Sequence, residues 1–99
     1  MTEEQILQLE SAWDSEGFLG HLRDGKFDNN LYQDFIFLLH SISFDEDALI
    51  SKKIISLLWY IPLFMEWQRE RVQNTISVNE YDLKRTSIAN ELERILGIP

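Results

Sequence analysis

The sequence predicts an all-α protein, a compact antiparallel bundle of four to six helices with a kink or break near Pro62. Apolar residues recur at helical spacing in several stretches, and the strict alternation typical of half-buried strands is absent. Helix-capping residues precede these stretches, and the connections are short, which favours antiparallel neighbours. With 99 residues, 44% of them hydrophobic, residues 1–99 are expected to form a single helical domain around one core.

The first helix is expected over about residues 3–13. Thr2 and Gln5 have the spacing of a capping box, in which each side chain bonds the backbone N–H of the other residue. Ile6, Leu9 and Trp13 lie on one face and are expected to point into the core.

A short second helix is expected from near Glu16 to Asp24, with Gly25 directly after its end. Gly17 and Gly20 weaken this interpretation, because glycine in a helix interior costs about 1 kcal/mol relative to alanine. The segment is therefore also compatible with an irregular turn.

The third helix has the clearest pattern and is expected to run to about Ile42. The segment Asp28-Asn29-Asn30 supplies residues that favour the N-cap position. The apolar residues follow the spacing of one helix face: Leu31, Phe35, Leu38, Leu39 and Ile42.

A fourth helix is expected to start at Asp45-Glu46-Asp47, since carboxylates suit the positive end of the helix dipole. Pro62 lacks a backbone donor and predicts a kink, or two helices over about 46–60 and 63–74. Trp59 and Phe64 lie off the apolar stripe, so we expect this segment to be covered on several sides. The stripe itself comprises Ile50, Ile54, Leu57, Leu58, Ile61 and Met65.

The last helix is expected over about residues 78–96. Ser77 and Glu80 form a second capping-box pair, and Gly97 and Pro99 end the helix. Its expected buried residues are Tyr81, Ile88, Leu92, Ile95 and Leu96.

The charge is unevenly distributed along the chain. Seventeen acids and nine Lys and Arg residues give a net charge of −8. Residues 1–50 hold eleven acids and two bases, a net of −9, whereas residues 51–99 hold six acids and seven bases, a net of +1. This balance argues against direct binding to nucleic acid or to an anionic membrane. It favours a basic protein partner, although acidity also serves solubility alone.

The chain contains no cysteine, which excludes disulfides and thiolate metal sites. No basic and apolar leader opens the sequence, and the most apolar run, residues 54–65, is shorter than the roughly 20 residues that span a bilayer. We therefore expect a cytoplasmic protein.

Sequence motifs of enzymes are missing: there is no phosphate-binding loop, no nucleophile elbow, no zinc-protease motif and no EF-hand spacing. Neither His21 nor His40 has a second histidine three or four residues away, so no metal site is expected. His21 and Asp24 can in principle form an acid–base pair, but a histidine bonded at a helix surface is the simpler interpretation. We expect no enzyme activity and no cofactor.

A partner-binding patch is expected on the third helix and the start of the fourth. Phe37 lies away from the apolar stripe and is a candidate exposed aromatic on an acidic face, an arrangement found at interface hot spots. If another helix covers Phe37, the patch loses its anchor. The expected patch comprises Asp34, Phe37, Ser41, Phe44, Asp45, Glu46 and Asp47.

In its size, acidity, helicity and lack of cysteine, the whole chain resembles the bacterial immunity proteins that neutralise colicin-type and contact-dependent growth inhibition nuclease toxins. It lacks the closely spaced Tyr-Tyr pair of the colicin DNase immunity proteins. The resemblance implies a non-catalytic, cytoplasmic inhibitor that binds a basic toxin domain.

Three other functions remain open at this stage. A small acidic adaptor or secretion chaperone would hold an apolar segment of a client in an exposed groove. An enzyme would use His21 and Asp24. A nucleic-acid mimic would carry regularly spaced acids over one face, which the more basic second half disfavours.

Overall fold

The computed structural model describes all 99 residues and is built from helices alone. This confirms the all-α prediction, with the number of helices at the top of the expected range. The helices are α1 (Glu3–Ala12), α2 (Phe18–Arg23), α3 (Asn29–Ser41), α4 (Lys52–Trp59), α5 (Ile61–Gln68) and α6 (Val78–Leu96).

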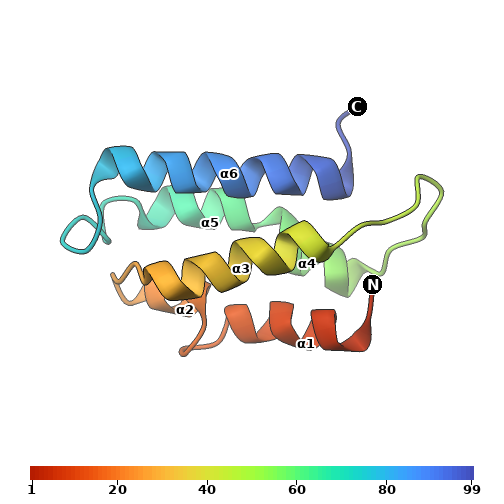
Figure 1. The fold of residues 1–99 in the computed structure, drawn as a ribbon, viewed down its shortest axis with the longest axis horizontal. Coiled ribbons are helices and arrows are strands. Elements are labelled where there is room, and N and C mark those ends of the chain that lie inside the picture. The colour runs from red at the N-terminus through yellow and green to blue at the C-terminus, as the bar shows by residue number, and fades with distance from the viewer.

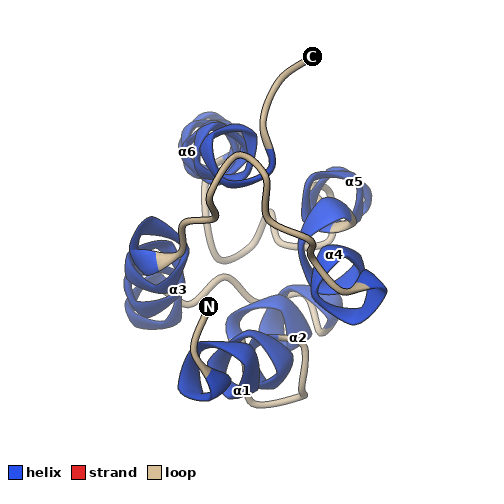
Figure 2. Cartoon of the chain, turned by 90° about the vertical axis from the view of Figure 1, so that its right-hand side faces the viewer, coloured by secondary structure: helices blue, strands red, loops and turns tan.

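The helices lie roughly parallel to the long axis of the molecule and surround a common core (Figures 1 and 2). α3 lies between α1 and α6, and the chain direction reverses from α1 to α3. α4 and α5 follow one another along the side of the bundle away from α3. The acidic residues 1–50 therefore supply α1, α2 and α3, and the nearly neutral residues 51–99 supply α4, α5 and α6.

Most helix ends lie where the capping residues predict them. The Thr2 and Gln5 capping box has both of its hydrogen bonds, and the Asp28 side chain accepts from the Leu31 N–H at 2.9 Å. Gly25 and Gly97 follow helix ends with φ of +81° and +89°, which glycine adopts without the clash that a Cβ would cause.

The predicted start of the fourth helix is wrong. Asp45 to Asp47 lie in a loop between Ile42 and Ser51, where Asp45 accepts a turn hydrogen bond from the Ala48 N–H at 2.9 Å. α4 begins six residues later, because the Ser51 hydroxyl caps it by accepting from the Ile54 N–H. The acids at 45–47 and the hydroxyl of Ser51 both favour a helix start, and the structure begins α4 after Ser51.

The predicted break near Pro62 is confirmed, with Tyr60 as the single residue between α4 and α5. Pro62 lies in the first turn of α5, where its missing N–H leaves no helical bond unmade. α5 ends at Gln68 rather than at residue 74, and turns follow it. In this turn region, the Thr75 hydroxyl accepts from the Phe27 N–H at 2.9 Å and fixes the turns to the α2–α3 loop.

The core consists of nineteen buried apolar residues contributed by all six helices and adjoining loops. Arg94 of α6 joins this packing at the end of α3, where its guanidinium donates to the carbonyl oxygens of Leu39 and Ile42, each at 2.9 Å. Since the last carbonyls of a helix lack partners within it, this contact caps α3 from another helix.

The α4–α5 segment is not covered on several sides, contrary to the expectation from its sequence. Trp59, Leu63 and Trp67 remain 55%, 41% and 60% exposed. Their spacing of four residues places them on one outward side of this segment, opposite the buried Leu58, Ile61 and Met65.

The two glycines that weakened the second-helix prediction allow α2 to pack closely against the end of α1. A Cβ at Gly20 would collide with the backbone carbonyl of Asp14, and a Cβ at Gly17 would collide with the carbonyls of Ser11 and Ala12. Gly17 is also the N-cap residue of α2, outside the helix interior. The glycines are required by packing, and α2 is a helix rather than an irregular turn.

Gly20→Ala is expected to destabilise the protein by about 1–3 kcal/mol, because the backbone of the α1–α2 turn at Asp14 must move away to admit the methyl group. Asn90→Ala is the matched control, since Asn90 is exposed on α6 and alanine favours a helix interior. It should leave the stability unchanged or raise it by about 0.5 kcal/mol. Urea unfolding of both variants measures the difference, and an equal or smaller loss for Gly20→Ala would contradict the close packing.

Tyr81→Phe is expected to cost about 1–3 kcal/mol although it removes a single oxygen. The buried Tyr81 hydroxyl donates to the Met65 carbonyl at 2.7 Å, in the last turn of α5, where carbonyls lack helical partners. Tyr60→Phe, at a half-buried position, should change stability by less than about 0.5 kcal/mol. Equal effects in denaturant unfolding would show that the Met65 carbonyl finds another partner.

Candidate functional site

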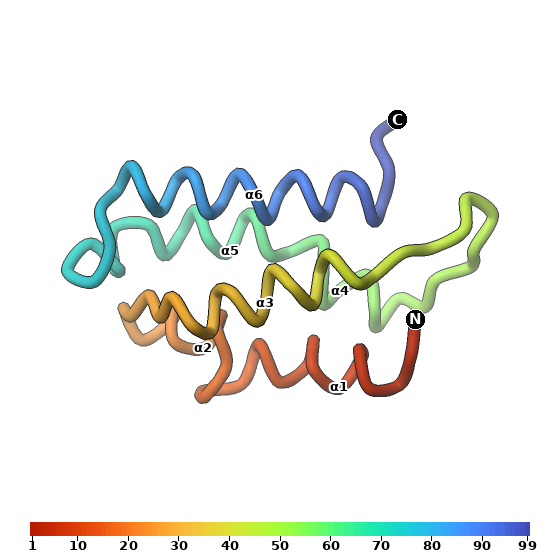
Figure 3. The backbone as a smooth tube through the Cα atoms, in the orientation of Figure 1, coloured from red at the N-terminus to blue at the C-terminus, as the bar shows by residue number.

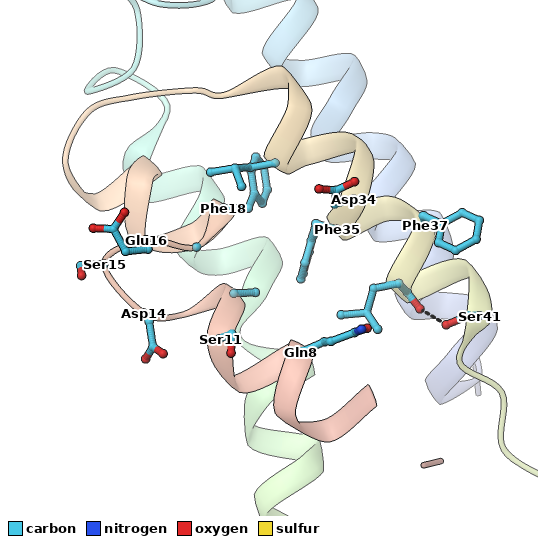
Figure 4. Close-up of a pocket in the computed structure, with 14 residues that line it drawn as sticks. Gln8, Ser11, Asp14, Ser15, Glu16, Phe18, Asp34, Phe35, Phe37 and Ser41 are labelled. Carbon is cyan, nitrogen blue, oxygen red and sulfur yellow. Dashed lines mark hydrogen bonds between the residues drawn. The ribbon is translucent and has the colours of Figure 1, made fainter. Parts of the chain in front are cut away.

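An open groove of about 920 Å³ lies between α1 and α3 (Figure 4). The turn from α1 to α2 bounds one end. Its lining residues are Gln8, Ser11, Ala12, Asp14, Ser15, Glu16, Gly17, Phe18, Leu31, Asp34, Phe35, Phe37, Leu38 and Ser41, and together they are called the acidic groove below.

The floor of the acidic groove is apolar and well supported. Phe18 and Phe35 are 2% and 3% exposed, and their rings stack with centroids 5.4 Å apart. Phe18 also packs edge-on against Phe27 and Tyr32, so it belongs to a larger aromatic cluster. Such a floor holds its shape, because moving any one ring disturbs several others.

The charged groups of the acidic groove all have the same sign. Asp14, Glu16 and Asp34 are exposed, and none of them forms an ion pair or a side-chain hydrogen bond within the protein. No lysine or arginine lines the groove. The arrangement therefore attracts a cation and repels an anion.

Three of the seven predicted patch residues line the acidic groove: Asp34, Phe37 and Ser41. Phe37 is 76% exposed, as the helix pattern indicated, so no other helix covers it. Ser41 contributes less to a binding surface, because its hydroxyl already donates to the Leu38 carbonyl at 2.6 Å and accepts from the Gln5 amide at 3.2 Å.

The other four predicted residues lie elsewhere. Phe44 is half-buried and packs against the core, so it is no exposed anchor. Asp45, Glu46 and Asp47 are exposed in the loop that extends beyond the end of α3 (Figure 3), and none of them lines the groove. The three acids therefore lie in a loop and not at the start of a helix, since ten residues separate α3 from α4. Partner binding by the seven residues stays a prediction.

Residues of α1 and of the α1–α2 turn, which the sequence did not single out, also line the acidic groove. Asp14, Ser15 and Glu16 reach the acidic groove from the α1–α2 turn, and Gln8 and Ser11 reach it from α1. The only sequence signal for them was a short polar run beside two glycines. It indicates a turn but does not indicate which helix the turn faces.

Three of the six acids of the second half are, in contrast, bonded to an arginine within the fold. Arg69 donates two hydrogen bonds of 2.9 Å to Asp82 and lowers the pKa of that carboxyl. Arg94 bonds Glu91 in the same way and lowers its pKa, and Arg85 pairs with Glu66. The two halves of the chain therefore differ in the number of acids and also in the fraction of acids that form ion pairs.

The His21 and Asp24 pair that the sequence allows is not formed. The His21 Nδ1 lies 2.9 Å from the Gly17 carbonyl, and no hydrogen bond joins this ring to Asp24. His40 is exposed, and its Nδ1 lies 3.4 Å from Glu91. No group of three or more His, Asp or Glu side chains is placed to hold a metal ion.

None of the six helices has both the length and the apolar character needed to cross a bilayer. Comparison with known proteins finds no matching family model, no matching curated protein and no matching solved structure.

The stability of the protein is expected to fall as the pH drops below about 4, in part through Asp82. Its pKa is lower in the folded protein than in the unfolded chain, so its ion pair stabilises the fold above the unfolded pKa of about 3.9 and is lost as the pH falls through the folded pKa. Asp82→Asn should therefore lower the urea midpoint at pH 7 and lower it less at pH 2.5.

Asp47→Asn is the matched control, since Asp47 is exposed in the loop and forms no ion pair. It should leave the urea midpoint nearly unchanged at both pH values. If the two variants lose the same stability at pH 7, the Arg69 pair does not stabilise the fold.

Proposed function

We propose that this protein is an immunity protein, a stoichiometric inhibitor that binds and neutralises a basic bacterial toxin in the cytoplasm. The observation that carries the proposal is the set of unpaired carboxylates in the α1–α3 half, three of which surround an open groove with an exposed aromatic residue at its rim. A nuclease is the favoured toxin, because a protein that binds nucleic acid presents a basic surface.

Unpaired carboxylates suit this role for a physical reason. A carboxylate that is already bonded to arginine, such as Asp82, has little attraction left for a partner. Free carboxylates raise the rate of association with a basic protein toward about 10⁸–10⁹ M⁻¹s⁻¹ at low salt. Exposed aromatic side chains such as Phe37 then hold the complex once it has formed.

The resemblance to immunity proteins in size, charge and helicity supports the same proposal. It also supports a non-catalytic mechanism, in which the inhibitor covers the basic surface of the toxin. Neither a histidine pair nor a metal-binding cluster on this chain favours a reaction of its own.

The second candidate is a small adaptor or secretion chaperone, and the exposed aromatic side of α4 and α5 favours it. Trp59, Tyr60 and Trp67 form a chain of edge-on contacts with centroids 5.4 and 5.8 Å apart, and both tryptophans are exposed. A client bound there by apolar contacts should associate at a rate that depends little on salt.

Charge reversal separates the two candidates. The purified protein is used to capture its partner from the source bacterium, and the captured protein is then tested for toxicity with and without the inhibitor. The expected partner is basic, loses its toxicity at a one-to-one ratio, and associates more slowly as salt rises from about 0.05 to 0.5 M. Asp14→Lys with Asp34→Lys, or Asp45→Lys with Asp47→Lys, should weaken its binding.

Glu80→Lys with Glu93→Lys is the matched control, because both acids are exposed on α6 and neither forms an ion pair. This pair makes the same change in net charge. The proposal is wrong if the control weakens binding as much as the two acidic pairs, if the partner is not basic, or if its activity continues when the inhibitor is in excess.

A further inference from the structure

We infer that the acidic groove binds an amphipathic helix of the partner, with Lys or Arg residues near the N-terminus of that helix. The inference rests on the proposed function and names the element that the groove accepts. It follows from three features of the groove: its charge is concentrated at one end, its walls are helices, and its rim is exposed.

The charge of the groove is concentrated at one end. α1 and α3 run in opposite directions, as the hydrogen bond from the Gln5 amide near the start of α1 to the Ser41 carbonyl at the end of α3 requires. Asp14, Glu16 and Asp34 therefore lie toward the α1–α2 turn (Figure 4), whereas Gln8 and Ser41 form an uncharged opposite end. A ligand with cations at one end fits this groove in one direction.

The middle of the groove is apolar. Ala12, Phe35 and Leu38 form the floor there, and all three are more than nine-tenths buried. A ligand made only of cationic and polar groups would leave this floor unused. The groove thus favours a ligand with an apolar face as well as positive charge.

The walls favour a helix over an extended peptide. Both walls are helices, whose internal backbone N–H and C=O groups already bond each other, so the groove presents no open strand edge. An extended peptide would lose water from its backbone without gaining partners, whereas a helix satisfies its own backbone. From Leu31 to Ser41, α3 offers a length of about 15 Å, which matches roughly three helical turns.

The same charges determine the direction in which the partner helix binds. The N-terminal end of a helix carries about half a positive charge, and it is stabilised beside carboxylates. The bound helix should therefore begin near the α1–α2 turn and run in the direction of α3. Phe37, 76% exposed at the rim, is placed to contact the apolar face of this helix.

The test uses a synthetic amphipathic peptide of leucine and lysine, about 14 residues and roughly 21 Å long as a helix, with additional lysines at its N-terminus. Isotope-labelled protein is titrated with it, and amide shifts are followed by NMR. The largest shifts are expected at Ser11, Ser15, Gly17 and Asp34. A spin label on the peptide N-terminus should broaden signals at Ser15 and Gly17 more than those at Gln8 and Ser41.

Two matched pairs of variants locate the binding. Asp34→Lys should weaken affinity for the peptide about tenfold or more, whereas Glu93→Lys, with the same change in net charge, should change it less than about twofold. Phe37→Ala should also weaken it about tenfold, whereas Leu83→Ala, at a leucine 69% exposed on α6, should not. A scrambled peptide of equal charge but without an apolar face should bind about tenfold more weakly.

The inference is overturned if the shifts map to α4 and α5 or to the 43–50 loop, if the bound peptide is extended, or if the scrambled peptide binds equally well. These results can be told apart from a failure of the proposed function. A basic toxin whose binding depends on Asp45 and Asp47 but not on Asp34 and Phe37 would leave the immunity proposal standing and exclude the groove.

Discussion

The close packing of α2 against the end of α1 is the constraint on which the candidate site depends. Gly17 and Gly20 bring the backbone of α2 against the carbonyls of Ser11, Ala12 and Asp14, with no room for a side chain. This contact places Phe18 under α3, where its ring stacks on Phe35. The groove between α1 and α3 is closed at that end by the same turn, which also carries Asp14 and Glu16 into its rim.

The division of charge has a structural meaning that the net charge alone does not convey. In the second half, arginines neutralise acids and join helices, as Arg69 does with Asp82, and Arg94 additionally caps α3. In the first half, most carboxylates have no such partner, and their mutual repulsion slightly opposes folding. Carboxylates without a partner in the fold remain free to attract one, and the proposed binding surface lies in this half for that reason.

The parts of the fold that the sequence predicts correctly depend on contacts between residues close together along the chain. The capping residues Thr2, Asp28 and Ser77 were identified correctly because a cap is a contact between residues about three positions apart. The acids of residues 45–47 misled for the same local reason: carboxylates are common both in helix first turns and in solvated loops, and only the Ser51 hydroxyl made the capping bond. Phe37 was placed correctly because exposure on a helix follows its periodicity.

The sequence by itself determined the all-helical class, the positions of most helices, the break at Pro62 and the concentration of acid in the first fifty residues. Each of these depends on residues near one another along the chain, or on composition. Only the tertiary structure decided that Phe37 and Asp34 share a groove with Asp14 and Glu16, that Phe44 packs on the core, and that Trp59 and Trp67 remain exposed. These depend on which helix faces share contacts, a question of packing that periodicity leaves undetermined.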